Sequence, residues 1–392
     1  MLPLQGVTVV AVEQAVAAPF ATRQLADLGA RVIKIERPGA GDFARAYDST
    51  VRGMASHFVW TNRSKESLTL DLKRPEAAEA LRRLVARADV FIHNLAPGAV
   101  NRLGFGSPAL RAAWPALVTC EISGYGTSGP YRDKKAYDLL VQSEAGLVAI
   151  TGTNDTPSKV GISIADIAAG MYAFSGILAA LLRRERTGEG AALEVSLFDA
   201  LAEWMGYPAY YTEYGGGAPA RTGARHAAIA PYGPYVAGDG KAVYFGIQND
   251  REWARFCERV LGRPELAIDP RFSSNASRVE HQAVLDEVIA AAFVPLTAAV
   301  AIERLDAAGI ANARMNTVRE FVDHPQLAAR NRWRDVDSPV GPLRALVPPF
   351  TLDGQEPRMD AIPAVGEHTD AILGELGFDA ATIARWRGAG IV

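Results

Sequence analysis

The chain has 392 residues, of which 49% are hydrophobic and 22% charged, and this predicts a folded protein of about two domains. Its formal net charge of −3 gives no reason to expect nucleic acid or a membrane as the main partner. Cys120 and Cys257 are the only cysteines, which argues against a disulfide framework or a cysteine zinc site. The N-terminal residues lack the pattern of a signal peptide, so we expect a cytoplasmic protein.

The first half of the chain alternates short β-rich runs with helical patterns. Predicted strands cover 7–12, 31–36, 89–94 and 116–123, and predicted helices cover about 18–28 and 75–88. Alternating strands and helices indicate a parallel sheet with helices on both faces. We therefore expect a ligand cleft beyond the carboxyl ends of the strands.

The composition changes after Met205, where aromatic residues and glycines become frequent. A hairpin is predicted to turn at Asp239-Gly240, and helical patterns follow at about 250–261, 279–293 and 297–308. These features divide the chain into three predicted segments. Residues 1–205 form the first part of a large Rossmann-like α/β domain, 206–325 a linker and a small α+β domain, and 326–392 a return to the large domain.

Several common catalytic motifs are missing from the sequence. It contains no G-x-G-x-x-G after the first strand, no G-x-x-x-x-G-K-[ST] and no G-x-S-x-G. The six histidines show no close ligand spacing, so we expect no metal site. Carboxylate chemistry, or a histidine–carboxylate pair brought together by the fold, remains.

One acidic residue lies within an otherwise apolar run. Asp166 occurs in "GISIADIAAG", just before the long apolar stretch 171–182. A carboxylate in such a run either caps a helix or carries chemistry. The spacing alone leaves both interpretations open.

Several longer motifs, in this order, resemble one known family. They are "AAPFATRQLADLGARVIKIERPGAGD", "NRSKESLTLDLKRPEA", "NLAPGAVNRLGF", "ISGYGTSGPYRDKKAYDLLVQ" and "GEHTD". The sequence resembles the class III CoA-transferases, the CaiB/BaiF group that includes formyl-CoA transferases and the related 2-methylacyl-CoA racemases. The resemblance implies two subunits threaded through each other as an interlocked homodimer. It also implies coenzyme A thioesters as substrates and no permanently bound cofactor.

The resemblance assigns expected roles to particular residues. Asp166 matches the aspartate nucleophile of the transferases, which forms an acyl anhydride and then an aspartyl-CoA thioester. By the same matching of motifs, the expected CoA contacts are Val16, Ala17, Arg37, Leu70, Asp71, Leu72, Lys73, Asn94, Leu95, Ala96, Arg102, Lys135, Ala136, Tyr137 and Asp138.

The acyl groups are less clearly indicated than the CoA site. The overall texture resembles transferases that use succinyl-CoA and a C4–C5 dicarboxylate such as mesaconate, itaconate or citramalate. The small-domain glycine loop of formyl-CoA:oxalate enzymes is missing, which disfavours oxalate. Gln14, Arg225 and His226 are candidate substrate contacts, because an arginine can hold a second carboxylate; a basic loop with no specific role remains the alternative.

Three other functions compete with transfer. The racemases of the family carry a histidine where this chain has Tyr137, and a phenol is a poor base at neutral pH. A non-catalytic CoA-binding protein would bind CoA without exchange. A dehydrogenase would need the phosphate-binding glycine loop that is missing.

Overall fold

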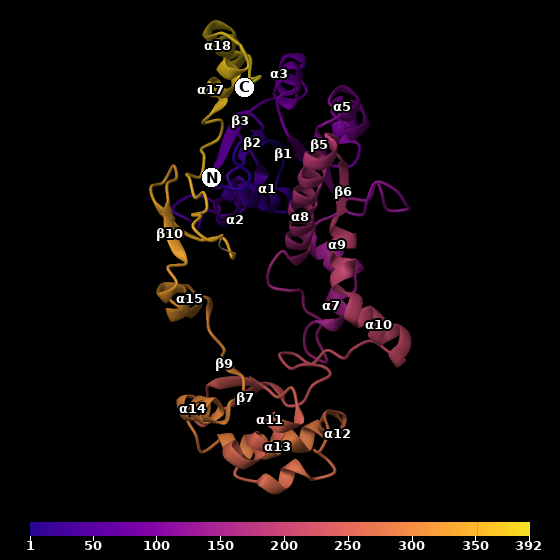
Figure 1. Ribbon diagram of the computed structural model, residues 1–392, viewed down its shortest axis with the longest axis vertical. Coiled ribbons are helices and arrows are strands. Elements are labelled where there is room, and N and C mark those ends of the chain that lie inside the picture. The colour runs from indigo at the N-terminus through magenta and orange to yellow at the C-terminus, as the bar shows by residue number, and fades with distance from the viewer. Residues whose placement is uncertain (351) are drawn as a thin grey trace. The chain divides into compact units, whose positions relative to one another are not determined.

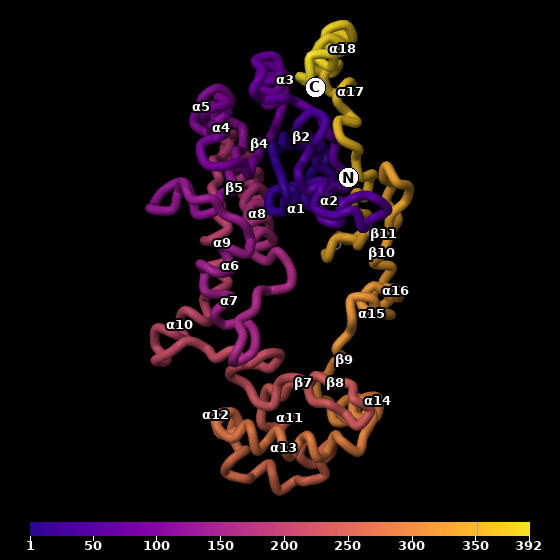
Figure 2. The backbone as a smooth tube through the Cα atoms, turned by 180° about the vertical axis from the view of Figure 1, so that it is seen from behind, coloured from indigo at the N-terminus to yellow at the C-terminus, as the bar shows by residue number. Residues whose placement is uncertain are grey.

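The computed structural model describes residues 1–350 and 352–392, which form two compact units (Figure 1). The larger unit contains 1–146, 160–207 and 328–392, and the smaller contains 147–159 and 208–327. Both chain ends belong to the larger unit (Figure 2). Residues 147–159, which the predicted ranges place in the first domain, group with the smaller unit.

A six-stranded parallel sheet organises the larger unit and confirms the predicted fold class. The strand order is β3-β2-β1-β4-β5-β6, so the order reverses on either side of β1. The strands are β1 (Thr8–Val12), β2 (Arg31–Glu36), β3 (Lys65–Thr69), β4 (Val90–His93), β5 (Val118–Ser123) and β6 (Ala192–Ser196). A separate antiparallel pair joins β10 (Trp333–Val336) to β11 (Leu343–Leu346).

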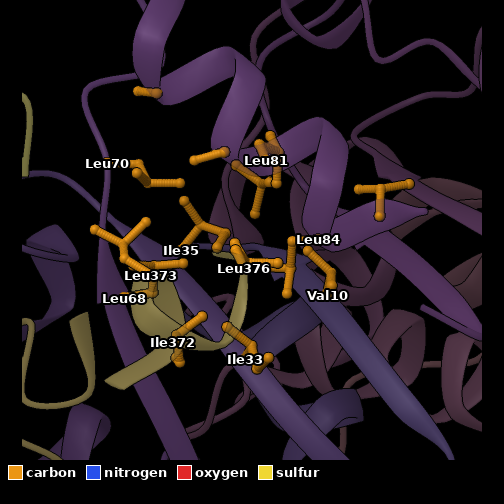
Figure 3. Close-up of a cluster of buried hydrophobic side chains, with 14 of the residues drawn as sticks. Val10, Ile33, Ile35, Leu68, Leu70, Leu81, Leu84, Ile372, Leu373 and Leu376 are labelled. Carbon is orange, nitrogen blue, oxygen red and sulfur yellow. The ribbon is translucent and has the colours of Figure 1, made fainter. Parts of the chain in front are cut away.

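Successive strand side chains point to opposite faces of the sheet, and both faces are buried. On one face Val10, Ile33, Ile35 and Leu68 pack against apolar residues of α3 (Pro75–Val85) and α17 (Thr369–Glu375), as Figure 3 shows. Other helices of this unit are α2 (Ser56–Thr61), α4 (Ala99–Arg102), α5 (Ser107–Ala113), α6 (Asp138–Glu144), α9 (Leu197–Trp204) and α18 (Ala380–Gly388), with a 3₁₀ turn η1 (Phe43–Ala46).

Helix α1 (Ala17–Asp27) packs along α8 (Ile164–Thr187), and both contact the sheet. Helix α8 extends well beyond the apolar stretch 171–182 that the sequence suggested as a core helix. Its length and hydropathy would also suit a membrane span, but half of its most apolar window is buried, as in the core helix of a soluble protein. Helices α13 (Gln282–Phe293) and α14 (Ala298–Ala308) meet the same criterion only together, across a bend of 111°.

The smaller unit has a three-stranded antiparallel sheet packed with short helices. Strands β7 (Tyr232–Val236) and β8 (Ala242–Gly246) flank the predicted turn at Asp239-Gly240, and β9 (Asn312–Arg314) completes the sheet. Apolar side chains from β7 and β8 join those of α13 and α14 in one core. Its remaining helical segments are α7 (Leu147–Ile150), α11 (Asp250–Arg255), η2 (Phe256–Val260), η3 (Pro264–Ala267), α12 (Asn275–Glu280) and α15 (Val318–Val322); α10 (Gly206–Gly215) and α16 (Pro325–Ala329) lie at its boundaries.

Candidate active site

A cavity of about 610 Å³ opens at the carboxyl ends of β1, β2 and β3. In open α/β sheets this edge, beside the reversal of strand order, is where ligands bind. The lining residues follow the strands and the loop after β4: Val12, Glu13, Gln14, Ile35, Glu36, Arg37, Pro38, Gly41, Asp42, Leu70, Asp71, Leu72, Lys73, Leu95, Ala99, Arg102, Leu103 and Gly390.

Seven of the fifteen residues expected to contact CoA line this cavity. They are Arg37, Leu70, Asp71, Leu72, Lys73, Leu95 and Arg102, and the candidate substrate contact Gln14 lies with them. The wall near Asp71 is held by the other end of the chain, because the Asp71 N–H donates to the Ile391 carbonyl at 2.8 Å.

Three cations of the cavity carry no ion pair within the part of the chain that the structure describes. Arg37, Lys73 and Arg102 are exposed at its rim, and only Arg37 donates a side-chain hydrogen bond, to Gln14 Oε1 at 3.2 Å. Many other arginines of the protein pair with a carboxylate, as Arg45 does with Glu36. Unpaired cations around a cavity favour an anionic ligand.

Asn94, Val16 and Ala17 do not line the cavity but shape the loop that does. Asn94 Oδ1 accepts the Gln14 N–H at 2.9 Å, and Asn94 Nδ2 donates to the Gln14 carbonyl at 2.8 Å. Ala15 has a φ of 60°, and its N–H donates to Asp42 Oδ1 at 3.1 Å. Val16 and Ala17 are buried where this β1–α1 loop enters α1. An alanine with a positive φ is strained. The side chains of Asn94 and Asp42 therefore hold the loop in a conformation that its own backbone disfavours.

Asp166 lies in the first turn of α8, but it is not the helix cap. The N-cap is Ser163, and Asp138 Oδ1 accepts the backbone N–H groups of Ala165 at 2.7 Å and Asp166 at 3.3 Å. The capping interpretation of Asp166 is therefore wrong, because a carboxylate from α6 already satisfies this helix end. Within 1–350 and 352–392, no donor bonds to the Asp166 carboxylate oxygens.

The environment of Asp166 makes its ionisation costly. Burial, and then the charge of Asp138, raise the pKa of Asp166 to about 7. Burial and the charges of Asp42 and Asp166 likewise raise the pKa of Tyr47 to about 12. Tyr47 therefore stays a neutral phenol that is subject to the charges of both Asp42 and Asp166. A titratable carboxylate poised near neutrality is typical of a functional group.

The residues 135–138, which were expected to contact CoA, lie partly on the surface and partly at the start of α6. Lys135 and Tyr137 are exposed, whereas Ala136 lies so close to Gly124 that a Cβ there would be 2.3 Å from the Ala136 Cβ. The neighbouring Asn94-x-Ala96 loop contributes Leu95 to the cavity wall, while Ala96 does not line it.

Arg225 and His226 belong to the smaller unit and already have partners there. Arg225 Nη1 lies 2.9 Å from Asp286 Oδ1, which also accepts the Tyr235 hydroxyl at 2.8 Å. The His226 ring stacks on Tyr232 with centroids 5.3 Å apart. Their contact with a substrate stays a prediction.

Sequence reasoning missed the acidic wall of the cavity, formed by Glu13, Glu36 and Asp42. Glu13 directly follows an apolar strand, and Glu36 ends another, which is a signal for this edge of the sheet. Although burial opposes it, Arg45, Lys34 and Ser67 lower the pKa of Glu36 to about 2. Among the residues that the structure describes, no group of three or more His, Cys, Asp or Glu side chains could hold a metal ion.

The family model for CoA-transferase family III matches residues 4–369. An acetyl-CoA:oxalate CoA-transferase of Acetobacter aceti is 38% identical over 84% of this chain and 85% of its own. A succinyl-CoA–D-citramalate CoA-transferase of Chloroflexus aurantiacus is 35% identical over 95% of this chain and 92% of its own. The crystal structure of a CaiB/BaiF family protein from Brucella suis superposes with a TM-score of 0.83 and 34% identity, over 96% of this chain and 99% of that one.

Proposed function

The chain belongs to CoA-transferase family III and is a CoA-transferase, and from that premise we propose both its route and its acceptor. CoA passes from an acyl-CoA, with succinyl-CoA as the first donor to test, to a C4–C5 dicarboxylate by way of Asp166. The observation that carries the proposal is the Asp166 carboxylate itself, which is titratable near neutral pH and accepts no hydrogen bond from the residues that the structure describes.

The proposed reaction consists of balanced acyl exchanges. Asp166 Oδ attacks the thioester carbonyl, which forms a mixed anhydride and releases CoA thiolate. The thiolate attacks the aspartyl carbonyl, which forms an aspartyl-CoA thioester and releases the donor carboxylate. The acceptor carboxylate attacks that thioester and expels the thiolate, which then attacks the acceptor acyl carbonyl and restores the Asp166 carboxylate. Each step trades one activated acyl bond for another.

Physical chemistry supports a half-buried carboxylate in this role. A carboxylate in water is a weak nucleophile, and proximity to a bound acyl group can supply an effective molarity of ~10⁵–10⁸ M. Asp138 Oδ1 accepts the N–H groups at the start of α8, so these groups are not free to hydrogen-bond the Asp166 carboxylate. Such hydrogen bonds would stabilise the carboxylate and make it a weaker nucleophile. Proton release from Asp166 near pH 7 then activates the group.

The cavity at the sheet edge supports CoA as the carrier. Its apolar wall suits an adenine ring, and the unpaired Arg37, Lys73 and Arg102 suit phosphate groups. Arginine pairs with phosphate through two parallel N–H bonds, whereas lysine offers a point charge.

The acceptor is proposed because this chain is similar to a D-citramalate CoA-transferase and resembles the dicarboxylate transferases of the family in its overall sequence. The oxalate relative offers a second acceptor class, which the sequence disfavours because the glycine loop is missing. Arg225 could hold a distal carboxylate only if it exchanged its Asp286 partner for substrate.

We also propose the interlocked homodimer that the resemblance implies. Met171, Tyr172, Leu182 and Trp204 leave an apolar surface exposed on α8 and α9, which a second copy of the chain would cover. Light scattering after size-exclusion chromatography tests this, and a monomer at micromolar concentration would contradict it.

A direct experiment tests the function. Purified protein is incubated with succinyl-CoA and each of mesaconate, itaconate, citramalate and oxalate, and products are identified by mass spectrometry. Hydroxylamine, added during turnover, is expected to mark Asp166 as a hydroxamate. Transfer that continues undiminished in Asp166→Ala refutes the mechanism, CoA binding without any transfer favours the binding protein, and α-carbon deuterium exchange without transfer favours the racemase.

A further inference from the structure

Four charged side chains form a cluster, a linked row of ion pairs at the β1–α1 loop. Glu13 Oε1 lies 2.7 Å from Lys65 Nζ and 3.3 Å from Lys34 Nζ, and Lys34 Nζ lies 2.8 Å from Asp42 Oδ2. All four side chains are fully buried. The cluster holds two charges of each sign, so it is neutral as a whole.

Stability alone does not explain such a cluster. Removing four charges from water costs several kcal/mol per ion, and well-packed apolar residues of similar size often stabilise a core equally well. Burial lowers the pKa of the Lys65 ammonium to about 7, with Glu13 acting in the opposite direction.

Hydrogen bonds from the cluster lead to the first two turns of α1. Lys65 Nζ donates to the Pro19 carbonyl at 2.9 Å, and the Thr22 hydroxyl donates to Glu13 Oε2 at 2.7 Å. On the other side, Asp42 Oδ1 accepts the N–H of the strained Ala15. Glu13 and Asp42 also line the cavity. One cluster thus fixes the cavity wall, the loop and the start of α1.

Helix α8 packs directly against the first turn of α1. A Cβ at Gly170 would lie 2.7 Å from the Ala17 carbonyl oxygen and 3.0 Å from the Phe20 ring, so the two helices touch backbone to backbone here. Asp166 lies one helical turn before Gly170. A shift at the start of α1 would therefore move Asp166 relative to the cavity.

We propose that Glu13, Lys34, Asp42 and Lys65 are positioning residues, which set the separation between the CoA cavity and the Asp166 carboxylate. In this proposal the cluster takes no part in the acyl exchanges and acts through the loop and α1. The inference rests on the proposed function, because it takes Asp166 as the nucleophile.

A second buried cluster on the same helix provides the control. At the far end of α1, Asp27 accepts from Arg63 through two bonds of 2.8 Å and from Arg23 at 3.0 Å. Neither the residues of this cluster nor their partner carbonyl at Leu346 line the cavity. Its side chains are at most 8% exposed, and among the described residues no hydrogen bond joins it to the β1–α1 loop. Its one contact with the start of α1 is the Arg23 guanidinium over the Phe20 ring.

The experiment compares two double variants that each remove one charge of either sign, so that the net charge of each cluster is kept. For Glu13→Gln with Lys65→Met, we expect kcat of CoA transfer to fall ~10–100-fold, because a displacement near 1 Å has that effect. KM for the acyl-CoA should change less than threefold, since Arg37, Lys73 and Arg102 remain. For Asp27→Asn with Arg63→Met, we expect a lower midpoint of thermal unfolding but kcat within twofold of the wild type. The second variant also takes Asp27 away from Arg23, which adds to its expected loss of stability.

Amide hydrogen exchange supplies a readout that needs no turnover. Residues 15–20 should lose protection in the first variant and keep it in the second. Equal losses of kcat in the two variants, or a first variant with wild-type kcat and wild-type protection of 15–20, would overturn the positioning role. A wild-type protein that transfers no CoA from any donor would refute the proposed function instead, and the exchange pattern would still decide whether the cluster orders the loop.

Discussion

Asp138 and Asp166 are joined through the start of α8: the Asp138 carboxylate accepts the Asp166 backbone N–H, while its charge opposes ionisation of the Asp166 side chain. The same residue thus caps the helix and raises the pKa of the carboxylate beside it. These two effects can be separated, because capping needs only an acceptor oxygen and the pKa shift needs a charge.

The variant Asp138→Asn keeps Oδ1 as a cap and removes the charge. For the wild type, kcat/KM should rise with pH to an inflection near 7 and then level off, because the ionised Asp166 is the reactive form. In the variant the inflection should move to lower pH yet stay above that of a free aspartate, since burial is the larger cause of the shift. Initial rates between pH 5 and 9 measure this, and an unmoved inflection would contradict it.

Replacing Asp166 should cost activity and add stability. Its pKa is about 7 in the folded protein against 3.8 for an ordinary aspartate, so the folded state binds more protons between those values. The wild type therefore loses stability as pH rises from about 4 to 7, and Asp166→Asn does not. At pH 8 the variant should be more stable by on the order of 1–3 kcal/mol, with a gain near zero at pH 4.

The control for that variant is Asp199→Asn. Asp199 holds the same position in the first turn of α9 but is exposed. An exposed acid near a helix N-terminus stabilises it by ~0.3–1 kcal/mol, so its loss should lower stability slightly. Urea unfolding at pH 4 and pH 8 measures the change in the free energy of unfolding for both variants. A change of the same sign in both at pH 8 would contradict a cost of ionising Asp166 in its half-buried position.

The fold was predictable where strands are apolar and less so where they are polar. Residues 7–12, 31–36, 89–94 and 116–123 contain the strands β1, β2, β4 and β5. Strand β3 begins "KES", and its Lys65 and Ser67 are buried only because Glu13 and Glu36 accept their hydrogen bonds. Strand β6 is a half-exposed edge strand. The residues of β3 and β6 alone therefore do not identify either segment as a strand of the sheet.

The candidate site was likewise predictable only in part. Arg37 directly follows a predicted strand, whereas residues 70–73 follow β3, which was not predicted. Both were expected at the CoA site because their motifs resemble those of the family. The cap of α8 comes from Asp138, 28 residues before Asp166, and local capping rules cannot find a partner at that separation. Likewise, the partners of Glu13 come from β2 and β3, which the sheet alone brings together.

The rim cations can be tested with substrates of different charge. Arg37→Ala and Arg102→Ala should each raise KM for the acyl-CoA ~5–30-fold, which corresponds to about 1–2 kcal/mol for an exposed charged contact, with kcat little changed. An acyl-pantetheine lacks every phosphate, so its KM should be the same in variant and wild type. Arg132→Ala, which removes an exposed cation that does not line the cavity, is the control. Equal effects on both substrates would show that the arginines do not contact phosphate.

Two glycines of α8 provide the last test, because only one lies against α1. Alanine generally stabilises a helix by about 1 kcal/mol over glycine. At Gly176 a Cβ would meet Leu193 at an ordinary 3.7 Å, so Gly176→Ala should gain stability and keep its activity. At Gly170 a Cβ would lie 2.7 Å from a backbone oxygen of Ala17, so that α1 and α8 must separate.

For Gly170→Ala we therefore expect a net loss of about 1–3 kcal/mol despite the better helix propensity. Because Asp166 is one turn away, kcat should fall while KM for the acyl-CoA stays close to the wild-type value. Thermal unfolding and initial rates on both variants decide the point. Wild-type stability and kcat in Gly170→Ala would mean that the contact between α1 and α8 can widen without moving the carboxylate, and the separation between cavity and Asp166 would then not depend on this helix pair.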